Sequence, residues 1–338
     1  MNASRKRTQN KRKMINLVIK DYAIRYIDAK KPNLYGVAEI GEYILPPNII
    51  REGKIVDPDR LRSILKDCVR RWKIRDREVQ FLVPDPFVMV RKIDIPLDVK
   101  DEEIKGHLYL ELGSNIHLPF EDPLFDFDFL EAREDKKEIL LFAAPEHIVT
   151  QYAELIESAG LKPVAADISS LAIYRLFHQM SKKSRSQPTG SASTLSIQYD
   201  LHTVTISIFN NHKLMLVRQL KLGLSPDSWE TTVDRMGAST TVWNGDEAYL
   251  KYEAKVIMEE IQRVINFYYS SISRSDEELE SIILTGDYPY LENITEDLQQ
   301  IFGKTPITFS EEWFEAQSGE LITPKYFLTL GLALKGGT

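Results

Sequence analysis

The sequence predicts an α/β protein built as two similar lobes, and three observations support this prediction. Short apolar strands alternate with amphipathic helices along most of the 338 residues, which is the pattern of layered α/β folds. A pattern of strand, turn and two further strands begins near residue 15 and begins again near residue 195. Between the two copies, residues 181–193 contain no aliphatic or aromatic residue larger than alanine. We therefore expect a flexible loop between the lobes.

The first copy opens with a predicted hairpin and a capped helix. Alternating apolar residues predict strands at about 15–19, 24–27 and 37–45. Asp57 followed by Pro58 predicts a helix start, because aspartate is a good N-cap and proline fits the first helical turn. The helix is expected to run to about residue 73, followed by a short buried strand at 79–83.

Residues 87–162 are expected to form an inserted module within the first lobe. The elements predicted there are a strand at 87–95, a helix around 101–112, an extended linker at 118–123, strands at 124–130 and 138–143, and a helix from about 145 to 158. A strand at 163–168 and a helix to about 179 then return to the first lobe. The first lobe is thus predicted to comprise residues 14–86 and 163–180.

The second lobe is predicted to cover residues 194–338, with a helical subdomain at about 225–280. Its expected elements, in chain order, are strands at 195–199, 203–209 and 213–219, a long helix at 247–272, a strand at 281–286, a helix at 290–302, a short strand near 306–309 and an apolar helix at 326–334. The acidic run from Glu277 to Glu280 is interpreted as the solvated start of a helix.

Composition limits the kind of partner that we expect. A net charge of −7 gives no general reason to expect nucleic-acid binding. No run of 18 apolar residues occurs, so no membrane span is predicted. Residues 1–13 form a basic tail, interpreted as disordered or as a weak anchor to anionic lipid. The single cysteine, Cys68, excludes an internal disulfide and is expected in the core.

Several segments resemble the family of the type IV pilus assembly protein PilM. They are Phe142–Tyr152, Ala159–Asp167, Glu260–Tyr268 and Tyr326–Leu334, together with the proline-phenylalanine segment Leu118–Asp122. The resemblance extends in the same order over roughly residues 15–335. It implies a two-lobed actin-like (ribonuclease H-like duplicated) fold with the inserted module that PilM shares with FtsA. FtsA usually ends in an amphipathic membrane-targeting helix, which residues 332–338 cannot supply.

The resemblance also implies a nucleotide between the lobes, held by an Asp-x-Gly turn in the first hairpin of each lobe. In this sequence Val18 and Lys20 occupy those positions in the first turn, and Gln198 and Asp200 occupy them in the second. Glycine is absent from residues 1–35 and 191–222. Because glycine lets backbone amides approach a phosphate, neither hairpin is expected to form the usual cradle.

Two further features bear on nucleotide binding. Gly286 and Asp287 keep one glycine of the family's adenosine-side Gly-Gly turn, although an ordinary turn at a strand end also explains them. Lys20 and His202 could still meet a phosphate through their side chains. We expect no cofactor, and magnesium-ATP remains the disfavoured alternative.

Other groups are interpreted without chemistry of their own. The six histidines show no metal-ligand spacing with a third partner. Asp126 and Asp128 alternate with phenylalanines and are expected on the solvent side of a strand. Asp167 is expected to cap the helix that connects the lobes. The chain is therefore predicted to have no catalytic residue and no metal site.

The resemblance implies a cytoplasmic scaffold at the inner face of the membrane, in a pilus, secretion or DNA-uptake machine. Its implied partner is the cytoplasmic N-terminal segment of a PilN-like membrane protein, bound between the first lobe and the module. Phe87, Met89 and Val90 are the suggested partner contacts, although core packing is the favoured explanation of these residues. An ATPase that switches or polymerises with nucleotide is the alternative.

Overall fold

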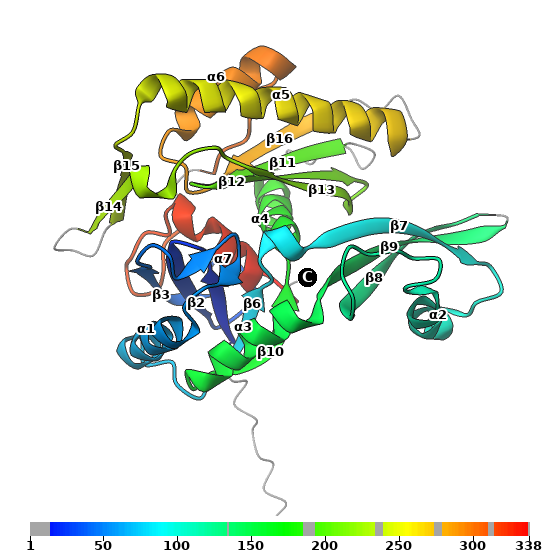
Figure 1. Cartoon of the computed structure of the whole chain (residues 1–338), viewed down its shortest axis with the longest axis horizontal. Helices are drawn as coiled ribbons and strands as arrows, with labels where there is room; N and C mark the ends of the chain where they lie inside the picture. Colours follow the sequence, from blue (N-terminus) through cyan, green and yellow to red (C-terminus); the bar gives the residue numbers. More distant parts are fainter. Residues whose placement is uncertain are drawn as a thin grey trace, which may run out of the picture.

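The computed structural model describes residues 14–133, 135–184, 193–233, 239–273, 279–309 and 314–336. Two mixed sheets lie one above the other with helices between and outside them, and a third sheet extends to one side (Figure 1). The helices are α1 (Pro58–Arg71), α2 (Ile104–Glu111), α3 (Glu146–Ser158), α4 (Ser169–Ser184), α5 (Glu247–Ser271), α6 (Leu291–Phe302) and α7 (Phe327–Ala333). The predicted α/β class is confirmed.

The first sheet has the strand order β10-β6-β1-β2-β3. Its strands are β1 (Met14–Ile19), β2 (Ala23–Ala29), β3 (Val37–Ile44), β6 (Glu78–Leu82) and β10 (Lys162–Asp167). β1 is antiparallel to β2 and parallel to β6. Successive side chains of a strand point to opposite faces, so Leu17 packs with α1 and α3 on one face while Val18 packs with α4 and α7 on the other.

The second sheet repeats this arrangement in the order β13-β12-β11-β16. Its strands are β11 (Ser193–Tyr199), β12 (Thr203–Asn210), β13 (Lys213–Lys221) and β16 (Leu279–Thr285). β11 is antiparallel to β12 and parallel to β16, as β1 is to β2 and β6. Helices α5 and α6 pack on one face of this sheet, and α4 and α7 contribute to the core on the other. The predicted repeat of topology is therefore present.

The third sheet is inserted between β6 and β10 of the first. It contains β7 (Met89–Pro96), β9 (Lys136–Pro145) and β8 (Pro123–Ala132), in that spatial order. Helix α2 packs on it, and together they form a small separate core around Leu108 and Ile139. Helix α3, predicted as part of the module, packs instead in the core of the first sheet, because its apolar side chains face α1 and β1. Phe125 and Phe127 face this core, whereas Asp126 and Asp128 are exposed, so the expected alternation along this strand is confirmed.

Several element boundaries differ from the sequence expectations. α4 continues to Ser184 and β11 already begins at Ser193, because lysine and serine are compatible with a helix as well as with a loop. The predicted loop at 181–193 is therefore shorter than expected, and residues 185–192 lie outside the described residues. The strand predicted near 306–309 is reduced to one bridge between Ile307 and Ile283.

Part of the predicted helical subdomain at 225–280 is a β-hairpin. β14 (Trp229–Val233) pairs with β15 (Ser239–Trp243) before α5 begins. Threonine, valine and tryptophan in both segments favour a strand, a signal that the helical expectation overlooked. Residues 277 and 278 lie outside the described residues, and Glu280 lies within β16, so the expected start of a helix at this run is wrong.

The remaining structural predictions concern single residues. Cys68 is buried in α1 as expected, and burial raises the pKa of its thiol to about 12. Asp167 is the last residue of β10 and precedes α4 by two positions. Its carboxylate pairs with Arg175 and Lys335, so the expected N-cap role is wrong. Among the described residues, no helix is long and apolar enough to cross a membrane.

Candidate functional site

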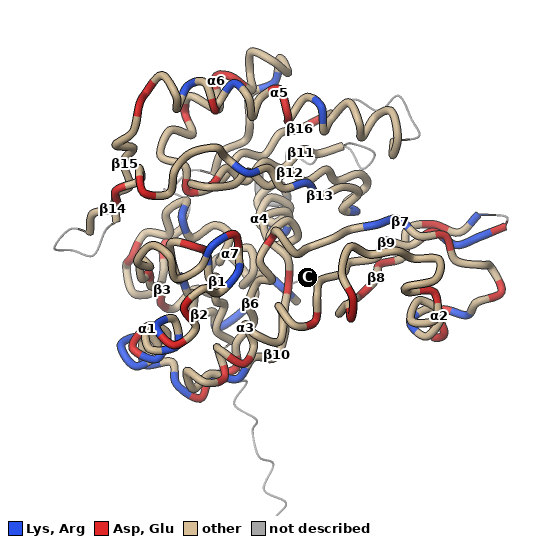
Figure 2. The backbone as a smooth tube through the Cα atoms, viewed as in Figure 1, with Lys and Arg blue, Asp and Glu red and all other residues tan. Residues whose placement is uncertain are grey.

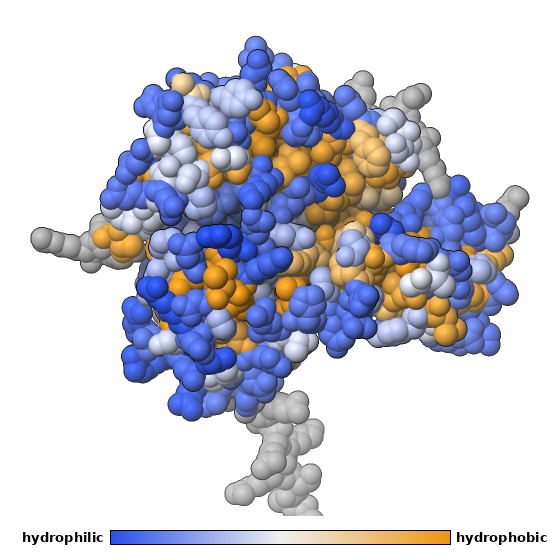
Figure 3. All heavy atoms as spheres, viewed as in Figure 1, coloured by the Kyte–Doolittle hydropathy of each residue, from blue (hydrophilic) through white to orange (hydrophobic). Residues whose placement is uncertain are grey.

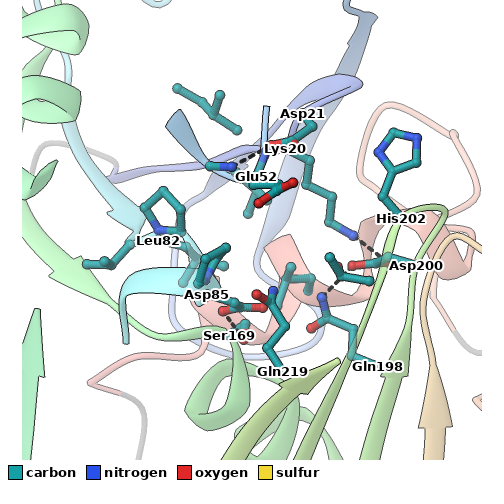
Figure 4. Close-up of a pocket in the computed structure, with 18 of the residues that line it drawn as sticks. Lys20, Asp21, Glu52, Leu82, Asp85, Ser169, Gln198, Asp200, His202 and Gln219 are labelled. Carbon is teal, nitrogen blue, oxygen red and sulfur yellow. Dashed lines mark hydrogen bonds and ion pairs between the residues drawn. The ribbon is translucent and has the colours of Figure 1, made fainter. Parts of the chain in front are cut away.

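The two hairpin turns singled out in the sequence lie opposite each other between the two main sheets. The β1–β2 turn brings Lys20 toward Asp200 of the β11–β12 turn, and Gln198 lies beside Asp200 (Figure 4). The turn that follows β16 carries Gly286 and Asp287 to the same place. The structure therefore brings together most of the residues at the predicted nucleotide-loop positions.

Lys20 fills the space between the turns with its own side chain. Its ammonium Nζ lies 2.8 Å from Oδ1 of Asp200 and 2.9 Å from Oδ2 of Asp287. The hydroxyl of Tyr22 also donates to Oδ2 of Asp287, at 2.5 Å. A side chain of the first sheet is thus held by two carboxylates of the second.

The ion pairs continue from Asp287 toward the edge of the first sheet. Nη1 of Arg25 lies 2.7 Å from Oδ2 of Asp287, and its Nε lies 2.7 Å from Oε1 of Glu42 on β3. Nζ of Lys325 lies 2.7 Å from Oε2 of Glu42. The hydroxyl of Ser239, at the start of β15, donates to the same oxygen at 2.6 Å. The contacts therefore join both sheets, the hairpin and the C-terminal segment.

The six charged groups form one chain in which the sign alternates at every step. In spatial order they are Asp200, Lys20, Asp287, Arg25, Glu42 and Lys325. We call this set the alternating ion-pair chain. Three cations and three carboxylates give it a formal charge of zero. The Arg25 side chain is 5% exposed and that of Lys20 is 13% exposed, so each charge depends on its neighbours rather than on water.

Burial and ion pairing shift the pKa values of these groups in opposite directions, and the effect of pairing is the larger. Burial works against the charged form of Asp287, but Arg25 and Lys20 outweigh it and hold the pKa of Asp287 well below its usual range. Burial likewise opposes ionisation of Glu42, and Arg25 and Lys325 hold its pKa below the usual value. Burial opposes the charge on Lys20, whereas Asp200 and Asp287 raise its pKa. Asp287, Glu42 and Lys20 are therefore charged at neutral pH.

The other predicted nucleotide-loop positions, Gln198, Val18 and Gly286, are compatible with this arrangement of charges. Nε2 of Gln198 donates to Oδ2 of Asp200 at 2.7 Å, and the backbone N–H of Asp287 donates to its Oδ1 at 3.0 Å. Val18 is a core residue, 3% exposed. At Gly286 the φ angle is +133°, and a Cβ there would lie 1.9 Å from the carbonyl oxygen of Tyr199. Glycine is needed for this close approach of two backbones.

A small cavity remains beside the ion-pair chain. Its volume is about 80 Å³, against several hundred Å³ for typical small-molecule sites. Asp85 lies on its wall, where burial raises the pKa of its carboxyl and the hydroxyls of Ser169 and Thr205 donate to it (Figure 4). His202 also lines the cavity, and burial lowers its pKa. Within the described ranges, no group of three or more His, Cys, Asp or Glu side chains could hold a metal ion.

Sequence analysis identified Lys20, Asp200 and Asp287 of this site but missed its other members. The missed members are Tyr22, Arg25, Glu42, Lys325 and Asp85. Arg25 and Lys325 are 300 residues apart in sequence, and neither lies in a motif. Only the unexpected lysine and aspartate in place of glycine gave a signal that could have prompted a search for oppositely charged partners.

A second candidate site is a groove on the module, where it meets α3. The groove has a volume of about 830 Å³ and lies beside the first residues of β8. The apolar part of its wall is formed by Tyr109, Leu112, Ile116, Leu118, Phe120 and Leu124. Its charged lining residues are three carboxylates, Glu121, Asp122 and Glu146. We call this the module groove; Figure 3 shows hydrophobic surface on this part of the molecule, at the right of the view.

The suggested partner contacts lie at the base of the module rather than in the module groove. Phe87 ends the short 3₁₀ helix η1 (Asp85–Phe87) and packs against the core shared by α1 and α3. Met89 and Val90 begin β7, and Val90 packs against the core between the two main sheets. All three are half-buried, and a partner contact at these residues stays a prediction.

Comparison with known proteins adds a family and a fold. A family model described as type IV pilus assembly protein PilM matches residues 17–233. A solved PilM-PilN type IV pilus biogenesis complex is similar in structure, with a TM-score of 0.74 and 18% identity over 96% of this chain and 98% of that chain. The predicted two-lobed actin-like fold with its inserted module is thereby confirmed. No curated protein matches the sequence.

Weaker structural similarities extend to other proteins. The ethanolamine utilization protein EutJ from Carboxydothermus hydrogenoformans gives a TM-score of 0.47 and 10% identity over 96% of this chain and 89% of that chain. ADP-bound MreB5 of Spiroplasma citri gives 0.45 and 10% identity over 95% of each chain.

Proposed function

The chain belongs to the family of the type IV pilus assembly protein PilM, and from this premise we propose that it is a scaffold which works without hydrolysing ATP. In this proposal it holds the cytoplasmic N-terminal segment of a PilN-like inner-membrane protein. It would lie at the inner face of the cytoplasmic membrane through that partner. The structurally similar PilM is part of a PilM-PilN complex, which supports this choice of partner.

The observation that carries the non-enzymatic part of the proposal is the position of Lys20. The fold would place the phosphates of a nucleotide between the two turns, and the Lys20 ammonium lies there between Asp200 and Asp287. A phosphate entering this space would have to displace Lys20 and would then meet two carboxylates. Like charges in a buried site repel strongly, so the alternating ion-pair chain supports a protein that keeps its lobes together without nucleotide.

The module groove supports a peptide as the bound partner. Its volume of about 830 Å³ and apolar walls suit several side chains of an extended segment. Glu121, Asp122 and Glu146 give its mouth a negative charge, and none of them is in an ion pair within the described part of the chain. Cytoplasmic segments beside a membrane span are enriched in lysine and arginine, so the charges of groove and partner are complementary.

Peptide binding tests the proposal directly. A fluorescein-labelled peptide with the N-terminal cytoplasmic sequence of the PilN-like protein from the same genome would be titrated with the full chain, and anisotropy measured. We expect saturable binding, weakened at least tenfold by Leu124→Asp, because this places a charge in the apolar groove. Phe267→Asp makes the same kind of change on the exposed face of α5 and should leave the affinity unchanged. No binding by the wild type would refute the proposed partner.

Nucleotide binding is tested separately by thermal unfolding with 1 mM magnesium-ATP. A ligand present at 100 times its Kd adds about 2.7 kcal/mol to the free energy of unfolding. We expect no rise in Tm, because Lys20 occupies the space between the turns. A magnesium-dependent rise would overturn the non-enzymatic part of the proposal and would favour a nucleotide-driven switch.

A further inference from the structure

A two-residue turn between β4 (Ile50–Arg51) and β5 (Lys54–Ile55) contacts four separate parts of the molecule. Its central residues are Glu52 and Gly53, with φ angles of +52° and +73°. Positive φ at both central positions is the conformation of tight hairpin turns. Sequence analysis did not single this turn out, and neither residue belongs to the alternating ion-pair chain.

The first two contacts connect the turn to the space between the sheets. The carboxylate of Asp21, the neighbour of Lys20, accepts hydrogen bonds from the backbone N–H groups of Glu52 at 2.6 Å and Gly53 at 3.0 Å (Figure 4). The side chain of Glu52 is paired with Lys221 at the end of β13 in the second sheet. The turn is therefore bound to the β1–β2 turn of one sheet and to an edge strand of the other.

The other two contacts connect the turn to the module and to α3. A Cβ on Gly53 would lie 2.7 Å from Cβ of Pro84 and 3.2 Å from the ring of Phe87, so the turn lies tightly against the segment that leads into β7. The carbonyl oxygen of Gly53 accepts a hydrogen bond of 3.0 Å from the hydroxyl of Tyr152 on α3. Tyr152 is only 1% exposed, so water cannot readily replace this bond.

Helix α3 connects the Glu52–Gly53 turn to the module groove. Its first residue, Glu146, lines the groove, and the backbone N–H of Glu146 donates to the carbonyl oxygen of Asp122, another lining residue. Tyr152 lies six residues further along, about 9 Å at 1.5 Å per residue. A rigid helix of this length transmits a shift at Tyr152 to its own first turn.

We propose that the Glu52–Gly53 turn couples the ion-paired closure of the two sheets to the shape of the module groove, with Tyr152 as the positioning residue on α3. This inference rests on the proposed peptide partner. When the sheets are held together, Lys20 holds the β1–β2 turn in place and Asp21 of that turn fixes the Glu52–Gly53 turn, whereas the exposed pair of Glu52 with Lys221 adds little. The Glu52–Gly53 turn then fixes Tyr152, and α3 keeps Glu146 and Asp122 at the groove. Opening the sheets releases the turn and loosens the groove.

The test compares Tyr152→Phe with a matched variant. Both Tyr152→Phe and Tyr290→Phe remove one hydroxyl with a single hydrogen bond, since the Tyr290 hydroxyl accepts from the backbone N–H of Trp243 at 3.3 Å, far from the groove. Tyr152→Phe should weaken binding of the labelled PilN-like peptide by up to about fivefold, because the coupling cannot exceed the value of the one buried hydrogen bond that is removed. Tyr290→Phe should bind like the wild type. Hydrogen exchange of α3 amides should rise only in Tyr152→Phe.

A double-mutant cycle separates coupling from a purely local effect. Lys20→Met alone should lower the affinity for the peptide. Adding Tyr152→Phe to Lys20→Met should then lower the affinity no further, because the turn is already released. Asp21→Asn replaces Lys20→Met in this cycle if the latter does not fold. Independent, multiplying effects would overturn the coupling, as would unchanged affinity and unchanged exchange in Tyr152→Phe. If the wild type binds no peptide, by contrast, the proposed partner is refuted, and this inference is refuted with it.

Discussion

The ion pairs between the two main sheets and the pairs that Lys136 and Lys137 make on the three-stranded sheet use the same residue types in opposite surroundings. Between the sheets, Arg25 and Glu42 are 5% and 6% exposed and share a continuous chain of partners. On the module, Asp94 pairs with Lys136 and Asp101 pairs with Lys137 while remaining 52% and 81% exposed. In Figure 2, both basic and acidic residues lie on β7 and β9 at the right of the view.

The difference lies in what a broken pair leaves behind. An exposed ion that loses its partner is solvated by water, so exposed pairs contribute little. A buried ion that loses its partner stays without compensation, at a cost of several kcal/mol. The alternating ion-pair chain therefore specifies one relative position of the sheets, whereas the exposed pairs of Lys136 and Lys137 on the module contribute little to its stability. The module depends instead on its own small apolar core.

Lys20→Met should give the largest effect of the substitutions that test this comparison. It leaves Asp200 and Asp287 without their shared cation in a buried site. We expect a loss of roughly 3–5 kcal/mol in the free energy of unfolding and a fall in Tm of about 4–7 °C for a chain of this length, measured by calorimetry. An unchanged Tm would show that the chain of charges does not hold the sheets together.

Acid should weaken the wild type more steeply than Lys20→Met. The pKa values of Asp287 and Glu42 are below their usual range in the folded protein, so in acid the unfolded chain binds more protons. Their stabilisation is complete above the unfolded pKa values of about 4 and is lost as pH falls toward the folded values. Lys20→Met removes one cause of the low pKa of Asp287. Equal slopes of Tm against pH between 5 and 3 would contradict this.

Lys325→Met removes an end of the alternating ion-pair chain rather than an interior member. Glu42 keeps its contacts with Arg25 and Ser239, so only one contact to a charged group is lost. We expect a loss of about 1–3 kcal/mol by chemical unfolding, clearly below that of Lys20→Met. A loss as large as that of Lys20→Met would mean that position in the chain does not matter.

Lys136→Ala on the module should have the smallest effect. Its partner Asp94 is half exposed and is solvated once the lysine is removed. We expect the Tm of the variant to stay within about 1 °C of the wild type. This small difference should not change with salt concentration. A fall of several degrees would show that the exposed pairs of the module contribute to its fold as the buried ones do.

The sequence was sufficient for the architecture because periodicity is local. The alternation of Ile15, Leu17 and Ile19 and the apolar stripe of α5 predicted their elements almost to the residue. The β14–β15 hairpin was missed because each of its strands is only five residues long, too short for a clear period. The end of α4 was misplaced because polar residues are compatible with both a helix and a loop.

The site was only half predictable for a different reason. Lys20 and Asp200 stood out because a turn that usually needs glycine carried charged residues instead. Glu42 and Lys325 look like ordinary surface charges, and their pairing depends on contacts across 283 residues of sequence. Tyr152 reads as one more apolar position of α3, and its hydroxyl gains a role only through the Gly53 carbonyl. Long-range polar contacts of this kind leave no local pattern.

The strict alternation along the chain of six charges also restricts how such a protein can change over generations. Replacing Lys20 by glycine, the first step toward a phosphate cradle, would leave Asp200 without its cation and Asp287 with Arg25 alone. Each intermediate sequence on that route would carry an uncompensated charge, and its fraction of folded protein would fall. The arrangement therefore makes a return to a glycine-lined phosphate turn difficult in evolution. Neutral drift can refine the pairs, but a lineage could leave this state only through several coordinated substitutions.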